Sequence, residues 1–145
     1  MRTILLIAAG LALLLIIVAA IGAALPRDHT ASRTLRVRRA PQDVWPVVKR
    51  VTAASSVPVD VLEEDPPRRL VTRVKETEKM FGGTWTVAIA PMPDGSELTI
   101  TENGWVANPV FRFVSRFIIG HHATMDDVLK QVAAALDQPA ALTGR

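Results

Sequence analysis

The sequence predicts an α+β domain, in which an antiparallel sheet packs around one long C-terminal helix, preceded by a single apolar N-terminal helix. Three observations lead to this prediction. Residues 4–25 contain no charged side chain, residues 32–101 contain short stretches of alternating polar and apolar residues, and residues 108–136 carry apolar residues mostly every three or four positions. Alternation is typical of half-buried strands, and the three-to-four spacing is typical of an amphipathic helix.

The apolar N-terminal stretch is long enough to cross a membrane. At about 1.5 Å per residue it spans roughly 33 Å, against roughly 30 Å for the hydrocarbon core of a bilayer. A cleavable signal peptide is the alternative, because Gly22, Ala23 and Ala24 offer small residues near a possible cleavage site, but its apolar core is typically only about 7–15 residues long. We therefore predict a transmembrane anchor at residues 1–26 and a single-pass membrane protein.

Arginines near the anchor predict its orientation. Arg2 precedes the apolar stretch, and a larger group follows it: Arg27, Arg33, Arg36, Arg38 and Arg39. The positive-inside rule then places the soluble domain on the cytoplasmic side, although most of the second group also fits a folded strand. The same arginines predict a mild attraction to anionic headgroups. The lack of cysteine fits either side of the membrane.

The domain begins soon after the anchor. Residues 27–31 are predicted to be a short linker, which would hold the domain close to the bilayer. Residues 32–39 alternate between apolar and polar side chains and predict the first strand. Pro41 then begins a short helix, since proline at the first helical position loses no hydrogen bond.

Further strands are predicted at residues 57–62, 70–75, 84–89 and 98–101. Pro58 cannot donate a hydrogen bond to a neighbouring strand, so the strand that contains it is predicted to lie at the edge of the sheet. Asp94 and Gly95 predict a hairpin turn between the last two strands. The domain as a whole is assigned to residues 32–137.

The last helix is predicted to run from Asn108 to Leu136 as one rod of roughly 43 Å. Asn108 is its expected cap and Pro109 its first residue. Gly120 would then lie in mid-helix, at a cost of about 1 kcal/mol relative to alanine, which a close approach of the sheet or a cavity would justify. Residues 138–145 are predicted to be a flexible tail.

The composition argues against several classes of function. The chain carries 17 lysines and arginines against 14 aspartates and glutamates, a formal net charge of +3, and no basic block is interleaved with aromatic residues. Nucleic-acid binding is therefore not expected. The sequence contains no phosphate-binding loop, dinucleotide fingerprint, His-Glu-x-x-His motif, Gly-x-Ser-x-Gly elbow or cysteine nucleophile, so neither a cofactor nor a metal site is predicted.

Glu102 is the main candidate for a polar site residue. It has the same strand parity as Leu98 and Ile100, so its side chain is predicted to face the last helix. Partial desolvation there suits a general acid or a ligand anchor. The structural alternative is that the strand ends at this point, and that Glu102 reaches water at the rim or pairs with Arg112 or Arg116.

Five further residues complete the predicted ligand-binding set: Trp85, Phe113, Phe117, His121 and Met125. The aromatic residues and Met125 could equally form an ordinary hydrophobic core. His121 continues the apolar stripe between Phe117 and Met125, so a core histidine with satisfied hydrogen bonds is the alternative to a functional one. No residue is predicted to be catalytic in the preferred interpretation.

Short motifs across most of the domain resemble one family. They are Ala40-Pro41 with Val44-Trp45, Asp65-Pro66-Pro67-Arg68-Arg69-Leu70-Val71, Phe81-Gly82-Gly83-Thr84-Trp85, Thr101-Glu102-x-Gly104, Asn108-Pro109-x-Phe111-Arg112-Phe113, and Ser115-Arg116-Phe117 leading to Gly120-His121. From about residue 32 to residue 136, the chain is similar to the polyketide cyclase and START-like superfamily called SRPBCC. The resemblance implies a helix-grip fold, in which a curved antiparallel sheet wraps around the C-terminal helix and encloses an apolar cavity. Members bind lipids, sterols, polyketides or other hydrophobic molecules, and some are cyclases or hydrolases.

The chain departs from this family in one respect. Members usually carry a second short helix and an extra hairpin before the Asp-Pro-Pro-Arg turn, whereas only residues 52–64 fill that interval in this chain. A shorter sheet is therefore expected, with a cavity that is smaller, open to one side or completed by another molecule.

Three hypotheses about function follow. The first is a membrane-anchored module without catalytic activity, whose partner is a membrane lipid or another hydrophobic, polyketide-like small molecule. The second is an enzyme of the cyclase or dehydratase kind that uses Glu102 and His121. The third is an adaptor domain that offers the open sheet edge near residues 57–61 to a protein partner.

Overall fold

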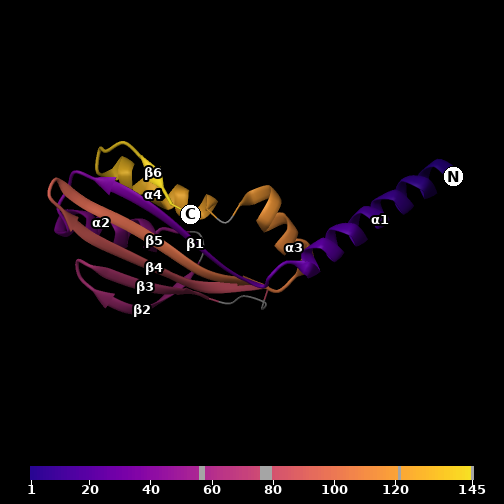
Figure 1. The fold of residues 1–145 in the computed structure, drawn as a ribbon, viewed down its shortest axis with the longest axis horizontal. Coiled ribbons are helices and arrows are strands. Elements are labelled where there is room, and N and C mark those ends of the chain that lie inside the picture. The colour runs from indigo at the N-terminus through magenta and orange to yellow at the C-terminus, as the bar shows by residue number, and fades with distance from the viewer. Residues whose placement is uncertain (56–57, 76–79, 121, 145) are drawn as a thin grey trace.

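The computed structural model describes residues 1–55, 58–75, 80–120 and 122–144. Within them, the order of elements is α1 (Arg2–Ala24), β1 (Asp28–Val37), α2 (Pro41–Ala53), β2 (Val59–Asp65), β3 (Arg69–Val74), β4 (Phe81–Met92), β5 (Gly95–Val106), α3 (Pro109–Val114), the π-helix η1 (Ser115–Ile119), α4 (Ala123–Ala135) and β6 (Leu142–Thr143). The α+β class is therefore confirmed. Figure 1 shows α1 projecting from one end of the domain, the end at which α3 lies.

The strands form one antiparallel sheet in the order β2-β3-β4-β5-β1-β6. β4 and β5 form a long hairpin, as predicted, but its two turn residues are Pro93 and Asp94 and not Asp94 and Gly95. Gly95 is already the first residue of β5 and pairs with Met92. β2 lies at the edge of the sheet, in agreement with the prediction from Pro58. Val57, the predicted first residue of this strand, lies outside the described residues.

The predicted linker at residues 27–31 is wrong, because β1 begins at Asp28. Its first residues pair with the end of β5, where Asp28 lies opposite Trp105 and Ala31 lies opposite Glu102. The predicted last strand ends at residue 101, whereas β5 continues to Val106 and offers the backbone partners that residues 28–31 need. The domain is therefore even closer to α1 than the sequence indicates.

Part of the predicted tail also has regular structure. Leu142 and Thr143 form β6, which pairs with Leu35 and Thr34 of β1. No pattern in the sequence indicates this short strand, because a two-residue strand has no periodicity of its own. β6 forms because β1 has an unpaired edge in the folded sheet, and that edge cannot be identified from the sequence of residues 138–145.

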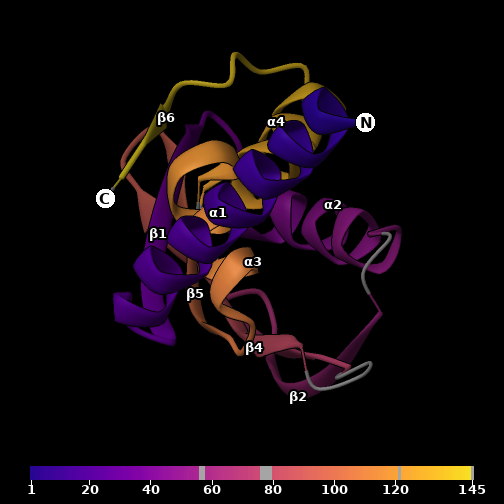
Figure 2. The ribbon, with the colours of Figure 1, turned by 90° about the vertical axis from the view of Figure 1, so that its right-hand side faces the viewer.

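One face of the sheet is covered by α2 and α4 (Figure 2). The buried side chains alternate along the strands, as the sequence predicts. In β5, for example, Ser96, Leu98 and Ile100 are buried while the residues between them are partly exposed. α4 contributes its own buried stripe: Met125, Val128, Leu129, Val132 and Ala133. Together these surfaces form the hydrophobic core of the domain.

The predicted single helix from Asn108 to Leu136 is wrong, although its beginning is confirmed. The side chain of Asn108 accepts hydrogen bonds from the backbone N–H groups of Val110 and Phe111, at 2.8 and 3.2 Å, and Pro109 is the first helical residue. The helix then widens into η1 and stops at Gly120, whose φ of 80° and ψ of 149° lie outside any helical region. A second helix, α4, starts at Ala123.

Gly120 is therefore a helix terminator. Apart from its chain neighbours, no described residue has an atom within 4 Å of the position that a Cβ on Gly120 would occupy. A close approach of the sheet therefore does not account for the glycine. What accounts for it is the backbone conformation, which residues with a Cβ rarely adopt. This break lets α4 pack on the sheet while α3 and η1 take a different course.

α1 and α3 pack closely where the apolar helix meets the domain. Gly22 is buried, and a Cβ on it would overlap the carbonyl group of Pro109. Arg112 of α3 donates one hydrogen bond to the carbonyl oxygen of Leu25 and another to that of Ala107, both at 2.9 Å. Arg112 thus binds one of the carbonyl groups that a helix end leaves without a partner. The rest of α1 exposes its apolar side chains, and α1 is long and apolar enough to span a membrane, a property that a signal sequence shares.

Candidate functional site

Glu102 lies on the inner face of β5, as its parity with Leu98 and Ile100 predicts. Leu98 and Ile100 are completely buried or nearly so, while the side chain of Glu102 is 22% exposed. The difference arises because Glu102 lies beyond the end of the packed core, between the sheet and the start of α4. A carboxylate in this position is screened from most of the solvent but is not sealed in the core.

The partner of Glu102 is His29, a residue outside the predicted ligand-binding set. Nε2 of His29 lies 3.3 Å from Oε1 of Glu102, and the histidine side chain is 17% exposed. His29 belongs to β1 and lies opposite Gly104 in the register with β5. A Cβ on Gly104 would lie 2.7 Å from Cε1 of the His29 ring, so the glycine leaves the space that the imidazole occupies.

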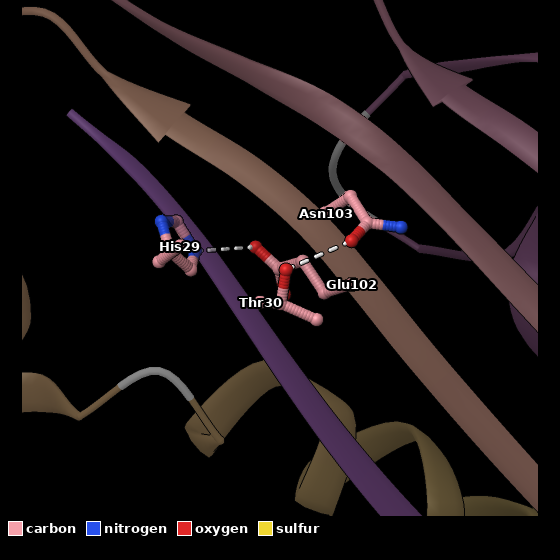
Figure 3. A network of polar contacts seen from close by, with 4 residues as sticks. All are labelled: His29, Thr30, Glu102 and Asn103. Atoms are coloured by element: carbon pink, nitrogen blue, oxygen red, sulfur yellow. Dashed lines mark hydrogen bonds and ion pairs between the residues drawn. The ribbon is translucent and has the colours of Figure 1, made fainter. Parts of the chain in front are cut away.

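A second pair of side chains joins the same strands on the outer face. Oγ1 of Thr30 donates a hydrogen bond to Oδ1 of Asn103 at 2.9 Å. Figure 3 shows this pair beside the pair formed by His29 and Glu102. Because neighbouring residues in a strand point to opposite faces, the two pairs together hold the beginning of β1 against the end of β5 on both sides of the sheet.

A pocket of about 290 Å³ lies between this part of the sheet and the helices that follow it. Its apolar wall is contributed by β4, β5, α3 and η1, and includes Phe81, Trp105, Phe111, Val114 and Ile119. His29 and Glu102 supply polar groups in the same wall. An apolar pocket with a few convergent polar groups is the usual form of a small-molecule site, although this volume lies just below the usual range of about 300–1,000 Å³.

A second pocket, of about 190 Å³, adjoins the first. Both are lined by Phe81, Gly82, Glu102 and Thr124, and the second continues along the sheet to Trp85. Glu102 therefore lies where the two pockets meet. An elongated apolar molecule could occupy both spaces while a polar group on it contacts the carboxylate.

Gly82 shapes the wall between the pockets. It lies opposite Trp105 in the pairing of β4 with β5. A Cβ on Gly82 would lie 2.9 Å from several atoms of the Trp105 indole ring. The glycine thus permits the indole to lie across the neighbouring strand and to form part of the pocket surface.

The structure brings together only some of the predicted ligand-binding residues. Trp85 and Glu102 lie opposite each other in the pairing of β4 with β5 and line the same pocket. Met125 is completely buried in the core, in agreement with the alternative interpretation. The rings of Phe113 and Phe117 pack on each other with centroids 5.0 Å apart, but neither residue lines the two pockets.

The remaining predictions concern histidines and arginines. His121 lies outside the described residues, so its predicted role stays a prediction. The alternative in which Glu102 pairs with Arg112 or Arg116 is wrong, since Glu102 pairs with His29 and Arg112 donates to backbone carbonyl oxygens. Among the residues that the structure describes, no group of three or more histidine, cysteine, aspartate or glutamate side chains could hold a metal ion.

The parity of His29 is the signal that could have identified it. In β1, His29 lies on the same face of the sheet as Ala31, Leu35 and Val37, all of which are buried. The interpretation of residues 27–31 as a linker hides this signal. Trp105, Phe111 and Thr124 carry no such signal, since their contribution to the pocket depends on where β5 ends and where the helix breaks.

These features define an α+β domain with an apolar pocket between its sheet and its C-terminal helices. No protein-family model matches the sequence, and the comparison with curated proteins finds no match. Solved structures do resemble the fold. Protein MLL2253 from Mesorhizobium loti superposes with a TM-score of 0.60 at 12% sequence identity, over 75% of this chain and 97% of that chain.

Two other structures give the same result. CalU16 from Micromonospora echinospora has a TM-score of 0.58 at 12% identity, over 79% of this chain and 78% of its own. Protein Mll3558 from Rhizobium loti has a TM-score of 0.53 at 20% identity, over 75% of this chain and 96% of its own. At these identities the similarity shows the fold of the domain and leaves its activity to be argued from the site.

Proposed function

We propose that the chain is a membrane-anchored member of the START-like SRPBCC superfamily that binds a hydrophobic molecule, such as a lipid or a polyketide-like compound, without catalysing a reaction. The observation that carries this proposal is the pair of adjoining apolar pockets that meet at Glu102. The helix-grip arrangement that the sequence motifs imply is consistent with α4 lying against the inner face of the sheet. The similar solved structures support the fold part of the proposal.

The lining of the pockets supports an amphipathic ligand. Aromatic and aliphatic side chains supply most of the surface of the larger pocket, while His29 and Glu102 supply its ionisable groups and Ser115 and Thr124 add hydroxyl groups. The side chains of His29 and Glu102 are 17% and 22% exposed. Burying apolar ligand surface contributes roughly 25 cal/mol per Å², and the polar pair would fix the orientation of the ligand. A mostly apolar ligand with a small polar end fits this distribution best.

The position of the pockets supports a ligand from the membrane. α1 meets the domain at α3, whose residues Phe111 and Val114 line the larger pocket. The pocket therefore lies next to the end of the proposed anchor. By the positive-inside rule we place the domain on the cytoplasmic side of the membrane. Labelling of an Asp94→Cys variant in sealed vesicles of known orientation would test that placement.

The proposal is tested by extracting ligands from the purified full chain and identifying them by mass spectrometry. Thr124 lines both pockets, so a Thr124→Phe substitution places a ring in the space that the ligand would occupy. Lys130 lies on the same helix with its side chain 59% exposed and lines neither pocket, so Lys130→Phe is the matched control. We expect a hydrophobic molecule to co-purify with the wild-type chain and the control, and to be depleted in Thr124→Phe.

Equal recovery from Thr124→Phe and Lys130→Phe would mean that the extracted molecule came from the detergent-solubilised membrane and not from the pockets. Recovery of no molecule from any of the three proteins would also contradict the proposal. The folded state of both variants is checked by circular dichroism, so that loss of ligand is not confused with loss of structure.

A second candidate function is favoured by the geometry of His29 and Glu102. A carboxylate and an imidazole 3.3 Å apart in the wall of one pocket can take up and donate protons, which a cyclase or dehydratase requires. The sequence predicts His121 as the residue that acts with Glu102, and the described structure offers His29 in that role. Glu102→Gln keeps the size of the side chain and removes its basicity.

The two functions differ in what is recovered from this variant. A binding module yields the same molecule from the wild type and from Glu102→Gln. An enzyme yields from the wild type a molecule that has lost water or closed a ring relative to the one retained by Glu102→Gln. A difference in mass would therefore favour an enzyme that removes water, and a difference in chromatographic retention at equal mass would favour one that closes a ring without losing atoms.

The adaptor hypothesis rests on β2. This edge strand exposes Val61 and Leu62, at 55% and 46%, and its outer edge has no neighbouring strand among the described residues. A partner strand could pair with it. Exposed acidic residues along β2, including Asp60 and Glu63, reduce its tendency to pair indiscriminately. An empty pocket in the extraction experiment would make this the preferred function.

A further inference from the structure

The segment formed by α3 and η1 (Pro109–Ile119) exposes an unusual amount of apolar surface. Phe111 is 48% exposed, Phe117 60%, Ile118 70% and Ile119 62%. Apart from α1, the other large apolar side chains exposed in the described structure are Val61, Leu62 and Phe81. Three consecutive apolar side chains exposed to this extent are costly in water, and an exposed apolar patch of this kind marks a surface that is covered in use.

The α3–η1 segment is held directly against the proposed anchor. The absence of a side chain at Gly22 brings α1 against Pro109, and Arg112 binds the carbonyl oxygen of Leu25 at the end of α1. Figure 1 shows both helices at the same end of the domain. A bilayer that contains α1 therefore reaches its polar boundary at the level of this segment.

The charges around the junction fit an anionic surface. A hollow of about 330 Å³ is lined by Arg27, Arg112 and Arg116, with Asp28 as the one carboxylate among the described residues of its wall. Arg27 and Arg116 are exposed, and neither forms an ion pair with any described residue. Basic residues beside an apolar face are what an anionic membrane interface attracts.

We propose that the α3–η1 segment lies in the interface of an anionic bilayer beside α1, with Phe117, Ile118 and Ile119 among the acyl chains and Arg27 and Arg116 at the headgroups. This inference rests on the proposed anchoring of α1 and adds a second point of attachment. A single helix lets the domain tilt and rotate above the membrane. Two attached segments, fixed to each other through Gly22 and Arg112, hold the domain in one orientation.

The lack of cysteine makes a direct test simple, since each introduced cysteine is the one thiol in the chain. We would prepare full-length Ile118→Cys, Leu14→Cys and Leu62→Cys, attach a nitroxide, and reconstitute each protein in vesicles of phosphatidylcholine and phosphatidylglycerol. The depth of each label is obtained from its accessibility to oxygen and to a water-soluble nickel complex. Leu62 is the matched control, because it is an exposed leucine on β2.

We expect the label at position 14 to lie deep in the bilayer, the label at 118 to lie roughly 5–10 Å below the headgroups, and the label at 62 to remain in water. Position 118 in water together with position 14 in the bilayer would overturn the inference and leave the anchor intact. Position 14 in water would overturn the anchoring itself, and this inference with it.

A second arm tests the charges. The Ile118→Cys label is compared in anionic vesicles and in vesicles of phosphatidylcholine alone, with and without the double substitution Arg27→Gln and Arg116→Gln. We expect the label to lie deeper in anionic vesicles, and the double substitution to remove that difference. Arg73→Gln, an exposed arginine on β3, should leave the difference unchanged. If the label on the protein that keeps both arginines lies equally deep in the two kinds of vesicle, anionic headgroups do not attract the segment, and that part of the inference is overturned.

Discussion

α4 and the α3–η1 segment come from one continuous apolar pattern, yet they end in opposite surroundings. In α4, Met125, Leu129 and Val132 are completely buried against the sheet. In η1, Phe117 and Ile118 are 60% and 70% exposed beside the end of α1. The same spacing of apolar residues thus produces a core helix and an exposed apolar segment. Periodicity predicts that a helix has an apolar face, but it does not tell what covers that face.

The difference between the two regions begins at Gly120. Its positive φ ends η1 and changes the direction of the chain, so that α4 can follow the sheet without continuing the line of α3. α3 is in turn fixed from the other side by its contact with Gly22 and by the hydrogen bonds of Arg112. One glycine and one helix contact therefore separate two regions that the sequence presents as one.

The largest expected effect compares a buried and an exposed residue of these regions. Leu129→Ala should lower the free energy of unfolding by about 2–5 kcal/mol, because it leaves a cavity at a completely buried site. Ile118→Ala should change it by less than about 0.5 kcal/mol, because its side chain is 70% exposed in the fold and can contact detergent in the folded and the unfolded protein alike. Denaturant unfolding of the full chain in detergent micelles measures both. Similar losses for the two variants would show that the α3–η1 segment is packed in the core.

A smaller effect is expected from removing the terminator. Gly120→Ala forces a residue with a Cβ into a conformation that costs about 1–3 kcal/mol, even though the site has space for the added atom. Gly10→Ala is the control, since no described residue lies within 4 Å of the added Cβ there either, but Gly10 lies in helical backbone. The two midpoints of unfolding are compared under the same conditions.

A stability of Gly120→Ala equal to that of the wild type would mean that the chain can repair the break, for example by joining η1 to α4. Circular dichroism would then show more helix in the variant. In that case the backbone conformation of Gly120 could not be the physical reason for the different surroundings of the two regions.

The smallest effect concerns the ion pair that ties α4 to the sheet. Nε of Arg33 on β1 lies 2.8 Å from Oδ1 of Asp126, and both side chains are less than a quarter exposed. Asp126→Asn should cost about 1 kcal/mol, at the upper end of the range for surface pairs. Asp60→Asn removes the exposed pair with Lys75 and should be nearly neutral. A larger loss from Asp60→Asn than from Asp126→Asn would contradict the view that this ion pair helps to hold α4.

Much of the sheet could be predicted because the alternation of apolar and polar residues within a strand indicates which of its side chains are buried. The alternation in β1, β3, β4 and β5, the presence of a hairpin turn next to Asp94 and the edge position of β2 are all local signals that the structure bears out. The ends of strands are less predictable. β5 continues to Val106 and β1 begins at Asp28 because each is the other's hydrogen-bond partner, and neither segment indicates this alone.

Part of the candidate site could also be predicted, because strand parity is a local signal, whereas the ends of elements are not. The inward direction of Glu102 follows from strand parity, and Trp85 lies opposite it in the same pocket. His29 escapes prediction because its segment resembles a linker. Phe113 and Phe117 belong to the predicted site because an unbroken helix would face the sheet, and they do not line the two pockets because the helix ends at Gly120.

Composition and periodicity alone establish an apolar N-terminal helix, an antiparallel sheet and a C-terminal pattern that must bury or shield its apolar face, because these properties depend on neighbouring residues. Which half of that pattern meets the sheet, and which histidine meets Glu102, is settled only when the elements pack together. Those outcomes depend on contacts between residues far apart in the chain, such as Gly22 with Pro109 and His29 with Glu102. No local sequence pattern predicts such contacts, because they stabilise the protein only after the elements have packed together.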